Sequence, residues 1–318
     1  MVLSRLLIWI PCSIILIIFV FILITSYICY KIIFCRIIEK DIPKYPLPPG
    51  RAYEKYKDEI ISYMKEVDQI KYKDVSITSF DGLKLCGKYY ECEKNAPIEL
   101  MVHGYRGDSR RDLSGGVIRA FKQNRNVLLI DNRASGRSEG KVITFGVKES
   151  KDCISWINFI ITNINKEAKI ILTGVSMGAA TVMIAASETL PNNVVAVLAD
   201  CGYTSTKAII KKVIKGMKLP PNFLYFFVKL GAIIFGKFTP DKVSPIKAME
   251  TSKLPIIFFH GDDDRFVPCD MSIENYNKCI SPKHLVLVKN AGHCLCYTQD
   301  SENYLKELEK FFTPILNN

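Results

Sequence analysis

Apolar and polar positions alternate in blocks along the chain from about residue 71 onward. Short apolar runs rich in β-branched residues predict buried strands, and longer runs with apolar positions three to four residues apart predict helices. The strands are expected within 74–92 (two strands around a turn at Asp81 and Gly82), 98–104, 126–133, 169–174, 192–200, 254–261 and 283–292. The helices are expected within 149–164, 177–190 and 301–312.

This order of elements predicts a fold of the α/β class. Strands and helices alternate, and continuously apolar strands are typical of a mostly parallel, doubly wound sheet that is covered by helices on both faces. The segment between Asp200 and Pro255 departs from the alternation, because it is apolar and basic at once. We expect it to form a helical cap, at about 203–253, over the ends of the strands.

The beginning of the chain follows a different pattern. The 25 residues from Leu6 to Tyr30 carry no charge, and a helix of that length, at about 1.5 Å per residue, exceeds the roughly 30 Å hydrocarbon thickness of a bilayer. A cleavable signal peptide is the alternative, but its apolar core is about 7–15 residues long and ends near small residues. We therefore expect one uncleaved transmembrane helix.

The flanks of this span predict its orientation. Four basic residues follow the span, at positions 31, 36, 40 and 44, whereas Arg5 precedes it. Positive flanks stay in the cytoplasm, so we expect a single-pass membrane protein with a cytoplasmic C-terminal domain. Four prolines within 41–50 break any helix. The expected organisation is an anchor over 1–40, a Pro-rich linker and lead-in helix over 41–70, and an α/β domain over 71–318.

Composition and charge narrow the classes of partner. The 318 residues are 48% hydrophobic, which suits one large globular domain or two modest ones. The eleven cysteines are scattered without a disulfide framework, as in a reducing compartment. The net charge of +11 is concentrated in 31–57 and 205–253. Because apolar residues accompany the lysines there, an anionic membrane surface is a better partner than nucleic acid, for which no recognition motif is evident.

Several residues able to perform chemistry directly follow expected strands. Ligands of parallel sheets bind at the carboxyl ends of the strands, so we expect these side chains to gather at one edge of the sheet. Their shared placement favours an enzyme. The residues are His103, Asp131, Ser176, Asp200, Asp264 and His293.

The segment from Gly174 to Gly178 reads Gly-Val-Ser-Met-Gly and lies between an expected strand and an expected helix. A sharp turn of this kind holds its serine in a strained conformation with the hydroxyl exposed above the sheet, and the flanking Gly174 and Gly178 avoid a clash there. The pentapeptide alone is common by chance. Its place between a strand and a helix rich in small residues makes Ser176 a candidate nucleophile.

A nucleophilic serine needs a base, and the base needs a carboxylate that orients it. Among the four histidines, His293 is the best placed base, because it follows the last strand in a loop that can reach the sheet edge; a solvated surface histidine is the alternative. Three consecutive aspartates at 262–264 follow another strand. A solvated loop or a weak calcium site is the alternative for them, but calcium needs more oxygen ligands.

The oxyanion formed during acyl transfer needs two N–H donors. We expect one donor to be the backbone N–H of Met177, directly after the serine, and the other to be that of Tyr105, in the loop after the strand within 98–104. Gly104 lets that loop approach closely. His103 and Gly104 would then shape the oxyanion hole without transferring a proton, and the ring of Tyr105 either lines an acyl pocket or simply packs.

The sequence resembles the alpha/beta-hydrolase superfamily, in particular its serine aminopeptidase-like and monoacylglycerol lipase-like branch, from about Tyr72 to Phe312. The motifs that carry the resemblance are "HGYRGD", "DNRASGRSEG", "GVSMGA", "HGDDDRFVP" and "AGH". The resemblance implies that the HG-x-x-D-x-x-V-P pattern places the acid of a triad at Asp264, which gives the chain order Ser176, Asp264, His293. It also implies that Ser138 belongs to a structural turn.

Residues and resemblance together predict a membrane-anchored serine hydrolase that cleaves an ester, with a lipid acyl ester as the suggested substrate. His293 would take the proton of Ser176, and an acyl-enzyme would follow, with no metal or cofactor required. A serine peptidase of the aminopeptidase-like kind is one alternative, and a non-catalytic, membrane-tethered binding protein of the same fold is another. No nucleic acid partner and no particular oligomeric state is predicted.

Overall fold

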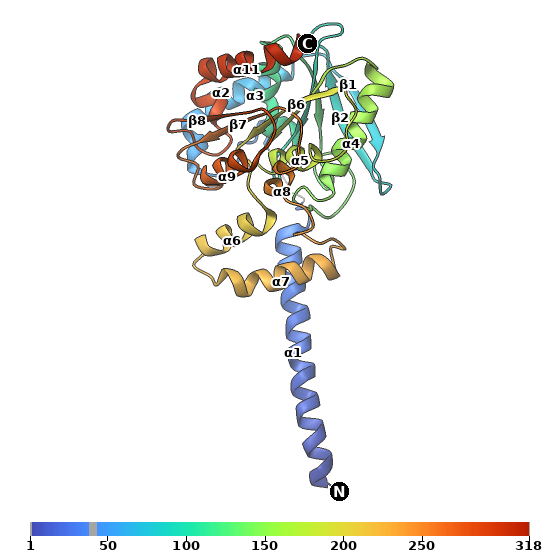
Figure 1. Cartoon of the computed structure of the whole chain (residues 1–318). Coiled ribbons are helices and arrows are strands. Elements are labelled where there is room, and N and C mark those ends of the chain that lie inside the picture. The colour runs from blue at the N-terminus through green and yellow to red at the C-terminus, as the bar shows by residue number, and fades with distance from the viewer. Residues whose placement is uncertain (1, 38–42, 318) are drawn as a thin grey trace.

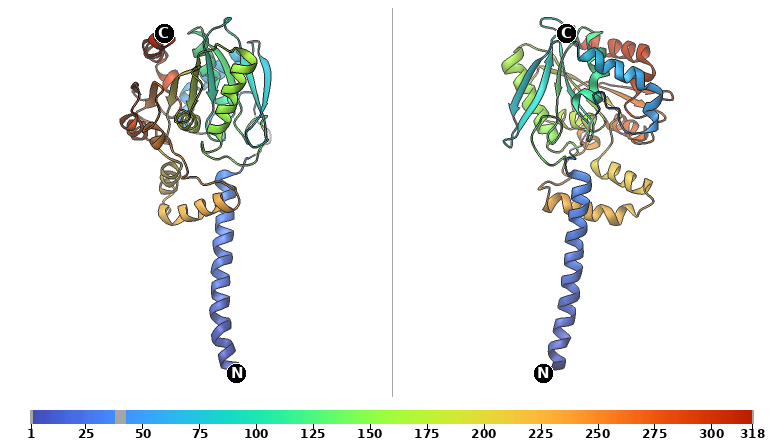
Figure 2. Two further views of the ribbon diagram at one scale, coloured as in Figure 1. Left: turned by 45° about the vertical axis from the view of Figure 1, so that its right-hand side comes forward. Right: turned by 180° about the vertical axis from the view of Figure 1, so that it is seen from behind.

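The computed structural model of the chain describes residues 2–37 and 43–317. A single long helix, α1 (Val2–Phe34), projects from a body in which helices cover both faces of a sheet (Figures 1 and 2). The expected boundary between anchor and linker, at residues 40 and 41, lies outside the described residues.

The sheet has eight strands in the order β1-β2-β4-β3-β5-β6-β7-β8. The pairs β1–β2 and β2–β4 are antiparallel, and all other pairs are parallel. The mostly parallel α/β fold that the sequence predicts is therefore confirmed, and each expected strand is present. The strands are β1 (Lys73–Thr78), β2 (Lys84–Tyr90), β3 (Ile98–Val102), β4 (Asn126–Ile130), β5 (Ile170–Val175), β6 (Val194–Asp200), β7 (Ile256–Gly261) and β8 (Lys283–Val288).

Alternate side chains of the central strands enter two separate cores. On β5, Ile170 and Leu172 belong to the core on one face, whereas Ile171 belongs to the core on the other face. On β7, Phe258 and Phe259 divide in the same way. Because side chains alternate across a strand, a strand that is buried on both faces must be continuously apolar, which explains the uninterrupted runs in the sequence.

Helices cover the two faces in two groups. The first core lies under α4 (Glu149–Phe159), α5 (Met177–Ala185), α8 (Pro245–Met249) and α9 (Asp270–Lys278). The opposite face is covered by α2 (Lys57–Val67), α3 (Ser109–Phe121) and α11 (Ser301–Leu316). Shorter elements are η1 (Arg51–Tyr56), the π-helical turn η2 (Ile160–Ile164) and α10 (Cys296–Gln299).

Among the described residues, one helix is long and apolar enough to cross a membrane. Its apolar stretch is Pro11–Phe34, with a mean hydropathy of 2.8 and 6% of its most apolar window buried in the protein. The charge-free run of the sequence thus forms a helix with an exposed apolar surface, as a membrane span requires.

The segment expected as a cap forms α6 (Thr206–Gly216) and α7 (Pro221–Ile234), which lie next to the point where α1 leaves the body (Figure 1). α7 crosses α1 so closely that a Cβ on Gly231 would lie 2.3 Å from the carbonyl oxygen of Ser26. The cap helices are therefore packed on the apolar helix. Large apolar side chains remain exposed on α7 and on the turn between α6 and α7, at Met217, Leu219, Phe223, Phe226, Ile233 and Ile234.

The last turn of α1 is fixed to the body. Phe34 is fully buried, with its ring centroid 5.7 Å from that of Phe145 and 5.1 Å from that of Phe238. The N–H of Ile143 donates to the carbonyl of Phe34 at 2.7 Å. The helix thus ends inside a packed cluster of the body rather than in a free linker.

Candidate active site

Ser176 lies in the turn between β5 and α5, at the carboxyl edge of the sheet. Its backbone has φ 55° and ψ −115°, a combination that costs free energy for a residue with a side chain. Its N–H donates to the carbonyl of Asp200 on β6 at 2.8 Å, which holds the strained turn against the sheet. The turn also needs its glycines, because a Cβ on Gly174 would lie 2.2 Å from the carbonyl oxygen of Gly178, and one on Gly178 would lie 1.9 Å from that of Val102.

The structure brings Ser176, His293 and Asp264 together in one hydrogen-bonded line. The Nε2 atom of His293 is 2.9 Å from the Ser176 hydroxyl, and its Nδ1 atom is 2.6 Å from Oδ2 of Asp264. The side chains of His293 and Asp264 come from the loops after β8 and β7, so the carboxyl ends of β5, β7 and β8 position the group. This arrangement allows the imidazole to accept the serine proton while the carboxylate holds its orientation.

Of the three consecutive aspartates, the one that the resemblance selects is the one that contacts His293. Asp262 accepts the N–H of Asn290 at 2.6 Å, and Asp263 is exposed and paired with Arg265. Asp264 is buried, and its Oδ1 accepts the N–H groups of Phe266 and Val267 at 2.9 and 2.8 Å. These bonds orient its other oxygen toward His293.

A second histidine supports Asp264, and the sequence did not identify it. His260, the fifth residue of β7, is fully buried, and its Nε2 lies 3.2 Å from Oδ2 of Asp264 and 2.8 Å from the carbonyl of Val267. Its Nδ1 is 2.6 Å from the hydroxyl of Ser272. The sequence feature that could have identified His260 is its position at the end of β7, four residues before Asp264.

These contacts shift the pKa values of the acid and the base in opposite directions. Burial disfavours the carboxylate of Asp264, but hydrogen bonds from His260 and His293 outweigh burial and hold its pKa well below the usual range. Burial also disfavours the imidazolium of His293, but the neighbouring Cys201 and the bond to Asp264 raise its pKa above the ordinary value. Asp264 is therefore ionised, and the raised pKa of His293 makes its imidazole a stronger proton acceptor.

The expected oxyanion donors are the N–H groups of Met177, directly after Ser176, and of Tyr105, in the loop after β3. Met177 is the first residue of α5, where a backbone N–H has no partner within the helix, and neither its N–H nor that of Tyr105 donates a hydrogen bond to any described residue. A Cβ on Gly104 would lie 3.5 Å from that of Ser176. The loop after β3 therefore passes directly beside the serine, where free N–H groups can meet an oxyanion.

His103 is buried behind this loop. Its Nε2 accepts the N–H of Asn132 at 3.0 Å, so its Nδ1 carries the proton and donates to the carbonyl of Gly104 at 2.8 Å. Both ring nitrogens are thus occupied by backbone groups, and the side chain shapes the loop. Away from the site, His284 is paired with Glu307 at 2.7 Å.

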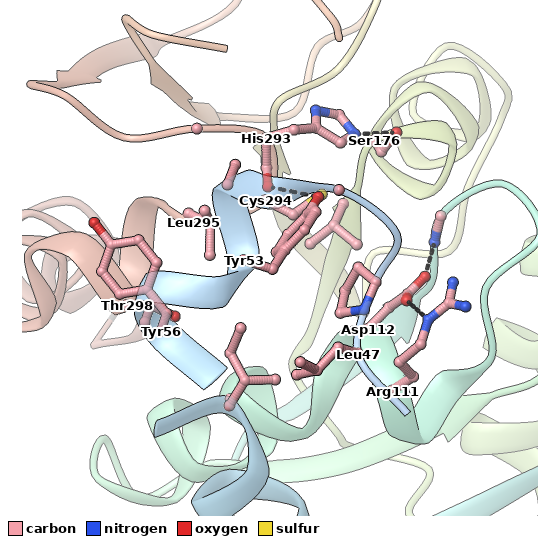
Figure 3. A pocket seen from close by; sticks show the side chains of 18 of the residues that line it. Leu47, Tyr53, Tyr56, Arg111, Asp112, Ser176, His293, Cys294, Leu295 and Thr298 are labelled. Carbon is pink, nitrogen blue, oxygen red and sulfur yellow. Dashed lines mark hydrogen bonds and ion pairs between the residues drawn. The ribbon is translucent and has the colours of Figure 1, made fainter. Parts of the chain in front are cut away.

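A cavity of about 1210 Å³ opens at Ser176 (Figure 3). The sequence predicts a cap at about 203–253 over the strand ends, but no described residue from 203 to 253 lines this cavity. One wall instead comes from the lead-in segment after the anchor and carries Leu47, Tyr53 and Tyr56 (Figure 3). The cap helices pack on α1, which leaves this wall to the chain that leads from α1 into the body.

The comparisons with known proteins agree with the fold. The family model described as alpha/beta hydrolase fold matches residues 100–241. The uncharacterised protein YqkD of Bacillus subtilis is 28% identical over 191 residues, which are 58% of this chain and 61% of YqkD. This chain thus spans about three fifths of the length of that relative.

A yeast protein and a solved structure extend this result. Protein bem46 of Schizosaccharomyces pombe is 26% identical over 200 residues, which are 61% of this chain and 60% of bem46. The esterase Pf2001 of Pyrococcus furiosus superposes with a TM-score of 0.64 at 24% identity and covers 86% of this chain and 99% of the esterase. The sheet order, the matched segment and the superposition on this esterase show that the chain has the alpha/beta-hydrolase fold.

Proposed function

We propose that the protein is a membrane-anchored serine hydrolase that cleaves carboxylic esters with an apolar acyl group. The observation that carries the proposal is the unbroken line from the Ser176 hydroxyl through His293 to Asp264, at 2.9 and 2.6 Å. A serine hydroxyl with a base in reach, and an acid that fixes the base, is the arrangement that activates a serine toward a carbonyl carbon.

In this mechanism, His293 takes the proton of Ser176 as Oγ attacks the ester carbonyl. The N–H groups of Met177 and Tyr105 stabilise the oxyanion, and removal of one such donor typically costs about 10²–10³ in rate. Protonated His293 then gives its proton to the leaving alcohol. Water, deprotonated by His293, releases the acyl group from Ser176.

The cavity supports an apolar acyl group. Its volume of about 1210 Å³ exceeds the roughly 300–1,000 Å³ of most small-molecule sites. The side chains of Leu47, Tyr53 and Leu295 line it near His293 (Figure 3), so a chain of methylene groups would gain burial there. The esterase that superposes on this chain is 24% identical in sequence. That similarity supports the fold of the proposed enzyme and leaves its substrate open to test.

The membrane part of the proposal rests on α1 and on the cap. Pro11–Phe34 is long enough to span a bilayer, and α6 and α7 lie where α1 enters the body, with exposed Phe223 and Phe226 close in sequence to the lysines of α6. Apolar side chains beside lysines suit the interface of an anionic leaflet. We expect the body on the cytoplasmic side, as the flanking charges predict.

Fluorophosphonate labelling tests the chemistry. The wild-type chain in detergent micelles should be labelled, and the Ser176→Ala and His293→Ala variants should not. Lack of labelling of folded wild-type protein would leave the non-catalytic alternative. A series of p-nitrophenyl esters of rising chain length, run beside aminoacyl anilides, then defines the substrate: preference for long esters supports the proposal, and preference for anilides would replace it with a peptidase.

A further inference from the structure

Two cysteines face each other beside His293. Cys201 directly follows β6, Cys294 directly follows His293, and their sulfur atoms are 3.2 Å apart without a covalent bond. One ring nitrogen of His293 and these two sulfurs form a group of atoms that all lie within 4.8 Å of one another. The proposed acyl transfer uses the imidazole but gives neither thiol a role.

The backbone holds both thiols in place at a cost. Cys201 has φ 49° and Cys294 has φ 56°, in the left-handed region that residues with side chains rarely adopt. Such strain persists only where the surrounding structure enforces it. At Cys201 the enforcing contact is visible, because its N–H donates to the carbonyl of Phe259 on the neighbouring strand at 2.8 Å.

Two thiolates and one imidazole are a ligand set for zinc. Zinc sites of this composition are tetrahedral and leave the fourth position open. With Zn–S bonds of about 2.3 Å, tetrahedral geometry places two sulfurs about 3.8 Å apart. The observed 3.2 Å therefore has to open by about half an ångström, which a rotation of two side chains can supply.

The partner of His293 also fits a metal ligand. Ligand histidines usually bind a carboxylate through the nitrogen that does not face the metal, and the carboxylate fixes the ring and strengthens the ligand. Asp264 bonds Nδ1 of His293 at 2.6 Å, which directs the lone pair of Nε2 away from Asp264. His293 and Cys294 both line the cavity, so an ion can reach them from there.

We propose that Cys201, Cys294 and His293 bind one zinc ion through the two sulfurs and Nε2, and that the bound ion stops acyl transfer. Two Zn–S bonds form as the two thiol protons pass to solvent. The Zn–N bond occupies the lone pair that would otherwise accept the proton of Ser176. The inhibitory effect rests on the proposed function, whereas the binding site itself does not.

Cobalt substitution tests the binding site. The reduced, metal-free full chain in detergent micelles, carrying Ser176→Ala so that no turnover is needed, is titrated with Co²⁺ and then with Zn²⁺. We expect one equivalent to produce a thiolate-to-cobalt charge-transfer band that zinc removes. Cys201→Ser and Cys294→Ser should each weaken binding by at least about 100-fold. Cys92→Ser, at the opposite edge of the sheet, should bind as the parent does.

The labelling rate of the wild-type chain tests the effect. Zinc should lower its fluorophosphonate labelling over the same concentrations at which it binds, and a chelator should restore it; in Cys201→Ser, zinc should leave that variant's own rate unchanged.

Absence of the charge-transfer band, or a band that persists in both cysteine variants, would overturn the site. A band without any effect on labelling would overturn the inhibition alone. Failure of metal-free wild type to label would count against the hydrolase and not against the site.

Discussion

The phenol of Tyr105 donates a hydrogen bond of 2.7 Å to the carbonyl of Ile33, in the last turn of α1. The next residue, Arg106, donates to the carbonyls of Ile32 and Cys35. The last carbonyls of a helix lack partners within the helix, so two neighbouring side chains of the loop after β3 satisfy the end of α1. That loop carries one of the two proposed oxyanion donors, and its position depends on the end of α1.

We expect Tyr105→Phe to lower kcat for a p-nitrophenyl ester by up to about tenfold, because a hydrogen bond contributes about 0.5–1.5 kcal/mol and its loss releases the loop from α1. KM should change less, since the cavity wall is retained. Tyr89→Phe, on β2, removes a hydroxyl away from the loop and should keep the wild-type rate. An unchanged kcat in Tyr105→Phe would show that the loop is held without this bond.

The pKa of His293 predicts the acid limb of the pH profile. Burial lowers this pKa, but Cys201 and the bond to Asp264 outweigh burial and raise it. The imidazole therefore keeps its proton to a higher pH than a free histidine and serves as a base only above it. The rate of fluorophosphonate labelling should therefore rise with pH and reach half its maximum above about pH 6.5, the ordinary histidine value. Asp264→Asn should move this midpoint downward and reduce the rate by about 10⁴.

His284→Gln is the matched control for this profile, because His284 contacts Glu307 at 2.7 Å, away from the site. Its profile should coincide with that of the wild-type chain. A midpoint that is the same in wild type and Asp264→Asn would mean that Asp264 does not act on His293.

The turn at Ser176 predicts a large effect of one methyl group. A Cβ on Gly174 would lie 2.2 Å from the carbonyl oxygen of Gly178, and neither backbone can move without displacing the serine. Gly174→Ala should lower the free energy of unfolding by at least about 1–3 kcal/mol, as overpacked cores do, and abolish labelling. Gly216→Ala at the end of α6, with nothing within 4 Å of its Cβ, should leave both the thermal midpoint and the labelling unchanged.

The crossing of α7 over α1 predicts a second effect of this kind. Gly231→Ala places a Cβ 2.3 Å from the carbonyl oxygen of Ser26, so α7 must move off α1. Hydrogen exchange followed by mass spectrometry should show faster exchange of the amides of α6 and α7 in this variant, with β5 and β6 unchanged. Equal amide protection of α6 and α7 in wild type and variant would show that α7 does not pack on α1 at Gly231.

The exposed face of the cap predicts contact with lipid. In a Trp9→Phe background, which leaves buried Trp156 as the other indole, Phe223→Trp should be quenched by brominated lipids in nanodiscs, and more strongly with anionic lipid. Ile280→Trp, which is also exposed but lies just before β8, should not be quenched. Equal quenching at both positions, or at neither, would contradict a cap that lies at the bilayer surface.

The strands were predictable because burial on both faces forces continuous apolar runs, as on β5 and β7. The side chains of the site were predictable because each follows its own strand at one edge. α3 was not predicted, since Gly115 and Gly116 interrupt its apolar spacing. His260 lies at the end of an expected strand, but its bond to Asp264 depends on how the loop after β7 folds back, which the sequence pattern does not show.

The wall that the lead-in segment gives to the cavity was not predicted, for a related reason. An apolar and basic insertion between β6 and β7 is typical of a lid, but the same composition suits a helix pair that packs on a membrane span, and composition does not separate the two. The lead-in segment reads as a Pro-rich linker, and a linker is expected to lie away from a site. Its prolines instead give a stiff, extended path along which Leu47 and Tyr53 reach the cavity.

The distance along the chain between α1 and the cavity is very short. α1 ends at Phe34, Arg36 is already bonded to the carbonyl of Ser138 at 3.0 Å, and Ile37 lines the cavity. With α1 in a bilayer, this short connection does not let the body rotate freely or move away from the bilayer surface. Ser176 is then held at one fixed height above the lipid headgroups. We therefore expect the protein to process molecules of the membrane that holds it and to ignore the same molecules in an opposing membrane.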